Sequence, residues 1–93
     1  MPKNIMDAPH GMNLVIHCND GAKYIGRFDQ CNGFEVLMHD CDVWDPAKPA
    51  SDDVDHWIRE TATYGVDVKH RDLRFDAHRV ESWQALGSIE KLR

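Results

Sequence analysis

Two Asx-Gly turns between short extended segments constrain the fold of this chain more than any other feature. Residues 19–21 (Asn-Asp-Gly) and 32–33 (Asn-Gly) are residue types that tolerate the positive φ of tight hairpin turns. Apolar and polar residues alternate over 12–18, and extended patterns also cover 23–28 and 34–44. We therefore predict an antiparallel meander of three strands.

The first strand of this meander has one apolar face. Its members alternate along the chain and are Met12, Leu14, Ile16 and Cys18. Asn13, Val15 and His17 occupy the other face. In the second strand Gly26 predicts a bulge or a sharp bend, which small closed sheets need.

A helix is predicted after the proline-containing loop 45–51. It spans about residues 52–64, with Ser51 or Asp52 as the N-cap and Gly65 as the C′ residue. An apolar stripe with helical spacing should dock on the sheet, and its members are Val54, Trp57, Ile58, Thr61 and Tyr64.

The rest of the chain predicts two further strands. Residues 66–79 alternate as a fourth strand, and a short turn near Ala77 and His78 leads to a fifth. A helical rhythm also fits 79–86, but we favour a strand there. The predicted fold is α+β: an antiparallel five-stranded small barrel or strongly bent sheet, in the order β-β-β-α-β-β, with one helix packed on it.

The domain organisation follows from these elements. Residues 1–11 carry two prolines and no clear period, which indicates a loose N-terminal arm. Residues 12–86 form a single α+β domain, and residues 87–93 are a C-terminal tail.

This strand order resembles the Sm-like small β-barrel proteins. The resemblance rests on residues 14–16 (Leu-Val-Ile), 20–21 (Asp-Gly), 24–28 (Tyr-Ile-Gly-Arg-Phe) and the closing pair of strands over 73–83. It implies a barrel that assembles as a ring or dimer. The Arg-Gly pair of the family's uridine-binding signature is missing from this chain. The pattern of Gly-Arg-Phe followed by a strand ending in Trp is also similar to uncharacterised proteins carried by phages and integron gene cassettes, which implies a mobile-element accessory protein.

Composition excludes several classes of function. The 93 residues contain 16 Asp or Glu and 11 Lys or Arg, so the net charge is −5. A long two-domain enzyme and nucleic-acid binding driven by overall charge are both excluded. The longest uninterrupted aliphatic runs have three residues, so we expect no membrane span and no export signal. Three cysteines without CxxC spacing then indicate reduced thiols and a cytoplasmic protein.

Basic residues gather in the last third of the chain. Residues 66–93 contain six Lys or Arg against five Asp or Glu. The candidates for binding nucleic acid or another partner are Lys69, Arg71, Arg74 and Arg79. Because Asp67, Asp72 and Asp76 are interleaved with them, the alternative is a solvated, ion-paired strand face.

Metal binding and thiol catalysis have weaker patterns. Residues 39–42 (His-Asp-Cys-Asp) place His39 and Cys41 on one side of a strand, and His17 and Cys18 lie on another strand. A zinc site needs three or four ligands, however, and no second paired motif completes the set. Cys31 lies near a turn without a fixed base. We therefore assign no metal, no cofactor and no catalytic residue.

Three tryptophans, Trp44, Trp57 and Trp83, are many for so small a core. We predict Trp83, on the last strand, at a subunit or partner interface, where Trp is enriched. The leading hypothesis is a non-enzymatic, oligomeric binding or adaptor module, a homodimer before any larger assembly. The alternatives are an Sm-like nucleic-acid-binding domain and a small metal-dependent or thiol enzyme.

Overall fold

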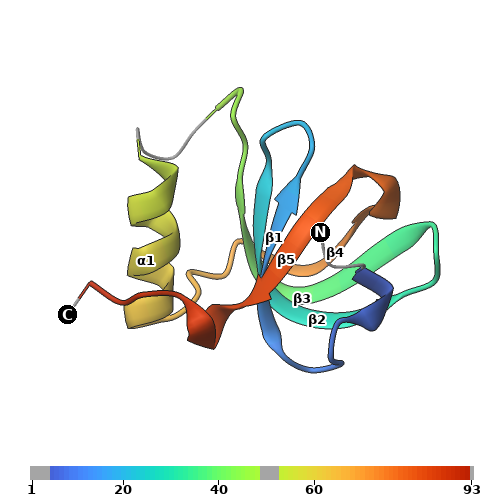
Figure 1. Cartoon of the computed structure of the whole chain (residues 1–93), viewed down its shortest axis with the longest axis horizontal. Coiled ribbons are helices and arrows are strands. Elements are labelled where there is room, and N and C mark those ends of the chain that lie inside the picture. The colour runs from blue at the N-terminus through green and yellow to red at the C-terminus, as the bar shows by residue number, and fades with distance from the viewer. Residues whose placement is uncertain (1–4, 49–52, 93) are drawn as a thin grey trace.

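The computed structural model describes residues 5–48 and 53–92, which form an α+β fold with one α-helix and a five-stranded antiparallel sheet (Figure 1). The strands are β1 (Asn13–Cys18), β2 (Lys23–Cys31), β3 (Glu35–Trp44), β4 (His70–Asp76) and β5 (Val80–Ala85). The helix α1 (Val54–Tyr64) lies between β3 and β4 in sequence. The order across the sheet is β4-β3-β2-β1-β5. Within the described residues β4 and β5 are the two ends of the sheet, so it is strongly bent but not closed into a barrel.

Both predicted hairpin turns are confirmed. Gly21 has a φ of 91° and Gly33 a φ of 95°. The Ala22 N–H donates to Asp20 Oδ1 over 3.0 Å, and the Phe34 N–H donates to Asn32 Oδ1 over 2.9 Å. Short polar side chains therefore fix both turns, as the Asx-Gly pattern predicts.

The predicted irregularity at Gly26 is a bulge that brings two strands into close contact. The pairing of β2 with β3 shifts register so that Gly26 faces both Asp40 and Cys41. Asp40 has a φ of 50°. A Cβ on residue 26 would lie 2.3 Å from Cys41 Cβ and 2.7 Å from Cys41 Cα. Only glycine fits here, and a bulge of this kind bends its strand.

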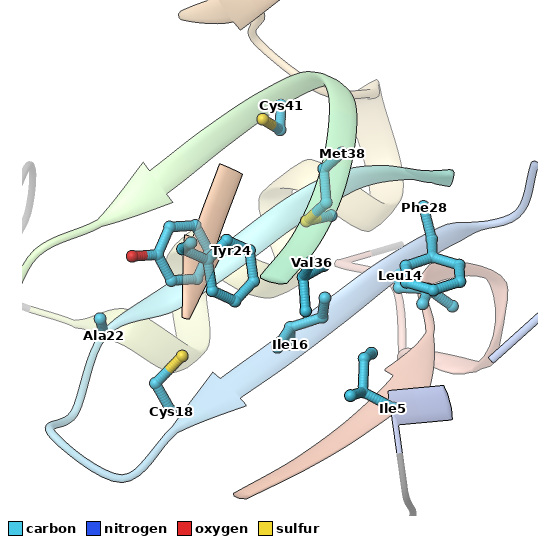
Figure 2. Close-up of a cluster of buried hydrophobic side chains, with 11 residues drawn as sticks. Ile5, Leu14, Ile16, Cys18, Ala22, Tyr24, Phe28, Val36, Met38 and Cys41 are labelled. Carbon is cyan, nitrogen blue, oxygen red and sulfur yellow. The ribbon is translucent and has the colours of Figure 1, made fainter. Parts of the chain in front are cut away.

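The inner cluster fills the concave side of the bent sheet (Figure 2). Its side chains point toward one another from β1, β2 and β3, joined by one from β4, and they include Leu14, Ile16, Tyr24, Phe28, Val36, Met38, Cys41 and Phe75. The rings of Tyr24 and Phe75 stack with centroids 4.0 Å apart. This core is built almost entirely by strands.

The N-terminal segment contributes to that core. Ile5, in a short 3-10 helix over Ile5–Asp7 (η1), is 5% exposed and belongs to the inner cluster. The Gly11 N–H donates to the Phe28 carbonyl over 2.7 Å. The part of the predicted loose arm that the structure describes, residues 5–11, is therefore attached to the sheet, because Ile5 is apolar enough to be buried. Residues 1–4 lie outside the described residues.

The outer cluster covers the opposite face of the sheet. It joins β1, β2 and β3 to α1 and consists of Val15, Ile25, Trp44, Trp57, Ile58 and Leu86. Val15, predicted on the polar face of its strand, is fully buried here. Tyr64 departs from the predicted docking stripe because it is 65% exposed. It lies in the last turn of α1, where the helix borders a cavity rather than the sheet.

The C-terminal end of α1 matches the prediction, whereas the N-cap is Asp53 and not the predicted Ser51 or Asp52. The Asp53 side chain accepts the His56 N–H over 3.1 Å and caps the N-terminus. The predicted caps, Ser51 and Asp52, lie outside the described residues. Gly65 has a φ of 97° and donates to the Thr61 carbonyl over 2.9 Å, which confirms its predicted position after the helix.

The C-terminal strands confirm the preferred interpretation of residues 79–86. A 3-10 helix at Ala77–Arg79 (η2) forms the predicted turn, and β5 follows as a strand. The fourth strand is shorter than predicted, since it begins at His70. Among the described residues, no helix has the length and apolar character that crossing a membrane would require.

The C-terminal segment predicted as a tail packs against α1. After a 3-10 helix at Leu86–Ser88 (η3), the chain crosses from β5 to the helix (Figure 1). The Arg59 side chain donates to the Glu90 and Lys91 carbonyls, each over 3.2 Å. The Leu92 N–H donates to Thr63 Oγ1 over 2.9 Å. Polar contacts to backbone groups therefore secure this segment, and apolar periodicity could not reveal them.

Candidate ligand-binding cavity

A cavity of about 490 Å³ lies between α1, β3 and the segment that joins α1 to β4; we call it the α1–β3 cavity. Its volume falls in the range of small-molecule sites. Strand β3 contributes Asp42 to its lining. The remaining lining residues come from α1 and residues 65–69, and include His56, Trp57, Glu60, Thr61, Tyr64, Asp67 and Lys69.

The Asp42 carboxylate is the most deeply buried charged group of the cavity. Asp42 is 9% exposed. Its Oδ1 accepts the Val43 N–H over 2.8 Å. Its Oδ2 lies 4.0 Å from Lys69 Nζ, which is beyond hydrogen-bond distance. The carboxylate is therefore anchored by a hydrogen bond through Oδ1, while Oδ2 forms a long ion pair with Lys69.

Lys69 lies at the cavity beside this carboxylate. The backbone N–H of Lys69 donates to the Cys41 carbonyl over 3.0 Å, which holds this part of the backbone against β3. Its Nζ donates to Asp67 Oδ2 over 2.6 Å, and this hydrogen bond raises the pKa of Lys69. Lys69 therefore remains an ammonium at neutral pH, held by Asp67 at the side of the cavity.

Aromatic rings form the apolar part of the lining. Trp57 is 8% exposed and packs against Trp44 with ring centroids 5.7 Å apart, so its position is fixed by the outer cluster. Tyr64 is largely exposed at the other end of the lining. An indole ring and a phenol ring that lie beside carboxylates form a favourable environment for an organic cation.

The charge of the lining is negative. Asp42, Glu60 and Asp67 contribute three carboxylates, against the single ammonium of Lys69. His56 lies 3.4 Å from Glu60 on the same helix. The cavity therefore combines a net negative charge with apolar walls.

The four predicted basic residues do not share this cavity. Only Lys69 lines it. Arg71 lies 4.0 Å from Asp40, and Arg79 lies 2.7 Å from Asp20. Arg74 is exposed on β4. Three of the four therefore face carboxylates, which is the arrangement expected of an ion-paired surface.

Arg79 lies over the ring of Tyr24, which belongs to the inner cluster. Its guanidinium donates through Nε and Nη2 to Asp20 Oδ2 and through Nη1 to the Tyr24 hydroxyl over 3.0 Å. These bonds join η2 to the β1–β2 turn. Trp83, the predicted interface residue, is half-buried and packs against the inner cluster.

His39 and Cys41 do not converge as a pair of metal ligands. His39 Nε2 lies 2.8 Å from Asp29 Oδ2, and its Nδ1 lies 2.8 Å from Asp72 Oδ1. Cys41 is fully buried opposite Gly26, because the bulge at Asp40 interrupts the alternation of β3. Among the described residues, no group of three or more His, Cys, Asp or Glu side chains is placed to hold a metal ion.

Two thiols are in surroundings that disfavour the thiolate. Burial raises the pKa of Cys18 to about 11 and that of Cys41 to about 11. Because the thiolate is the nucleophile, neither side chain is activated for attack at neutral pH. Cys31, at the end of β2, is half-buried.

Sequence reasoning missed the cavity because its parts are far apart in the chain. Asp42 was visible only as a member of the acidic run at 39–42, and Asp67 only as an interruption of the basic strip. No protein-family model matches this chain, and no curated protein shows significant similarity to it.

Proposed function

We propose that this protein is a non-enzymatic binding module that forms homo-oligomers and holds a ligand in the α1–β3 cavity. The observation that carries the proposal is the Asp42 carboxylate, whose side chain is 13% exposed and lines a cavity of about 490 Å³. A buried charge is costly unless it is paired. Asp42 lies at an open cavity beside Trp57, and its ion pair with Lys69 is long, at 4.0 Å, which supports a role in binding.

The chemistry of the thiols supports binding over thiol catalysis. A cysteine nucleophile needs a lowered pKa or an adjacent base. Burial shifts the pKa of Cys18 and Cys41 in the opposite direction. His39, the histidine nearest in sequence to Cys41, has both ring nitrogens within hydrogen-bond distance of carboxylates.

The binding proposal is tested by obstructing the cavity. Amide chemical shifts of the protein would be followed by NMR during addition of small molecules of positive, neutral and negative charge. Val66 lines the cavity and is half-buried, so Val66→Trp should fill it and abolish the shifts. Val68→Trp is the matched control, because Val68 is exposed and outside the lining. Equal shifts in both variants, or none in the wild type, would overturn the proposal.

The two ends of the sheet support the oligomeric part of the proposal. β4 carries Arg71, Asp72, Arg74 and Asp76 within seven residues, and charges of this kind discourage edge pairing. β5 has Glu81 as its only Asp, Glu, Lys or Arg and also carries Trp83. We therefore assign β5 as the strand through which two copies pair.

Size-exclusion chromatography with light scattering tests this pairing. We expect a dimer at high micromolar concentration. Ser82→Lys adds a charge on β5 and should shift the population toward the monomer. Gln30→Lys, at an exposed position on the interior strand β2, should leave the dimer unchanged. A strict monomer for the wild type would contradict the assignment.

A further inference from the structure

We propose that the α1–β3 cavity takes an organic ammonium whose charged head pairs with Asp42 and whose apolar chain lies against Trp57. This inference rests on the binding function proposed above and names the chemical class of the ligand. It follows from three observations: the sign of the charge, the Oδ2 of Asp42, whose ion pair with Lys69 is long, and the aromatic lining.

The sign of the charge selects a cation. Three of the lining residues are carboxylates and one is an ammonium. An anionic ligand would meet Asp42, Glu60 and Asp67 as like charges, and this repulsion disfavours its binding. A cation would meet a favourable field that also raises its rate of entry.

Asp42 supplies the position for that cation. Its Oδ1 is already used by the Val43 N–H, which orients the carboxylate. Its Oδ2 is 4.0 Å from the nearest ammonium, so a ligand N–H could approach it within 3 Å without breaking an existing hydrogen bond. Because Asp42 is buried, such a pair would be less screened than one at the surface.

Lys69 shows that the space beside Asp42 can accommodate an ammonium group. It brings a primary ammonium to the same cavity, where its Nζ donates to Asp67 over 2.6 Å and forms a long ion pair with Asp42 Oδ2 at 4.0 Å. Lys69 therefore acts as an internal competitor of the ligand. Removing its charge should strengthen the binding of an external ammonium.

The aromatic lining favours an ammonium with an organic body over a metal ion. Trp57 and Tyr64 supply ring surface, which attracts cations through the ring quadrupole and covers alkyl groups. A hard metal ion would instead need several oxygen ligands at short distance. An alkylammonium satisfies both the charged and the apolar part of the lining.

The experiment compares three probes with the same carbon chain. Pentylamine, 1-pentanol and pentanoate would be titrated into the wild-type protein at low ionic strength and pH 7, with amide shifts as the readout, up to about 10 mM. We expect pentylamine to shift the amides of cavity residues with at least about tenfold higher affinity than the other two probes. Nα-acetyl-lysine methylamide presents the same head group as a peptide side chain, and its affinity relative to pentylamine shows whether the natural source is a free amine or a lysine.

Two variants and a control test the assignment of Asp42 and Lys69. Asp42→Asn keeps an oxygen for the Val43 N–H and should weaken pentylamine binding at least about tenfold. Lys69→Met should strengthen it severalfold. Asp55→Asn removes a carboxylate from α1 at a position outside the cavity lining and should leave the affinity unchanged. All three variants would first be checked for a dispersed amide spectrum like that of the wild type.

The outcomes separate this inference from the proposed function. If 1-pentanol or pentanoate binds in the cavity as tightly as pentylamine, the cavity is a binding site but the ammonium assignment falls. Unchanged pentylamine affinity in Asp42→Asn also overturns the assignment. If no probe, the lysine derivative included, shifts the cavity amides, both the assignment and the binding function fall.

Discussion

The two faces of the bent sheet are stabilised in different ways. The inner cluster is built from strands that are also joined by backbone ladders, and side chains such as Leu14, Ile16 and Met38 are fully buried. The outer face carries α1, which is held by Trp57 and Ile58 and by the C-terminal segment. The outer side includes the α1–β3 cavity.

This difference separates the part of the chain that specifies the fold from the part that offers a site. Elements with fewer buried contacts open at lower free energy than core strands. Ligand sites are often built from peripheral elements held by a rigid scaffold. The sheet is that scaffold here, and α1 with residues 65–69 forms the wall of the cavity.

The largest predicted effect comes from detaching α1. Trp57→Ala removes its main anchor in the outer cluster and should lower the free energy of unfolding by about 3–5 kcal/mol, measured by urea denaturation. Hydrogen exchange should show α1 losing protection first, with β1 and β2 still protected. Glu60→Ala, on the exposed side of the same helix, should change stability by less than about 0.5 kcal/mol. Equal losses of unfolding free energy in the two variants would show that Trp57 does not anchor the helix.

The next effect tests the inner side of the comparison. Gly26→Ala places a Cβ against the backbone of Cys41, which a side-chain rotation cannot relieve. We expect a loss of about 1–3 kcal/mol, the usual cost of overpacking a core. Gly87→Ala is the matched control, since a Cβ there meets nothing within 4 Å, and it should cost less than about 0.5 kcal/mol. Tolerance of alanine at position 26 equal to that at position 87 would contradict the described close contact.

The same two regions differ in how far sequence predicts them. The meander could be predicted because its turns are local: Gly21 and Gly33 need only their neighbours to adopt a positive φ. Gly26 could be identified as an irregularity. The helix followed from its spacing and from Gly65, whereas burial of Val15 on the second face depends on α1, which is distant in the sequence.

The candidate site was less accessible for the same physical reason. Asp42 and Lys69 are 27 positions apart and meet only because β3 and the segment after α1 lie side by side. Alternation placed His39 and Cys41 on one side of a strand, but the positive φ of Asp40 changes that arrangement. Pairings that depend on tertiary folding leave no periodic signal.

A smaller effect sharpens the view of α1 as a separately anchored element. Asp53→Ala removes the acceptor for the His56 N–H and should cost about 1 kcal/mol. Asp53→Asn retains an acceptor oxygen and should change stability by less than about 0.5 kcal/mol. Circular dichroism during urea denaturation would measure both. A loss in Asp53→Asn equal to that in Asp53→Ala would show that the charge, rather than the cap, is what matters.

The smallest effect concerns pH and the part of the sheet away from α1. His39 joins β2, β3 and β4, since its ring lies between Asp29 and Asp72. Hydrogen bonds, first to Asp29 and then to Asp72, raise the pKa of His39 above its ordinary value of 6.5. The protonated ring is favoured in the folded state, so its stabilisation is complete below about pH 6.5 and is lost as the pH rises through the higher, folded-state pKa.

His17 provides the opposite case within the same sheet. Burial, with the nearby charge of Lys23, lowers the pKa of His17. NMR titration of the ring protons should therefore give a midpoint above 6.5 for His39 and below 6.5 for His17. Asp29→Asn should lower the His39 midpoint more than Asp72→Asn does, and Asp55→Asn on α1 should leave it unchanged. A His39 midpoint that moves with Asp55 but not with Asp29 would show that the two regions are electrostatically coupled, and the separation of scaffold from helix would then fail at this point.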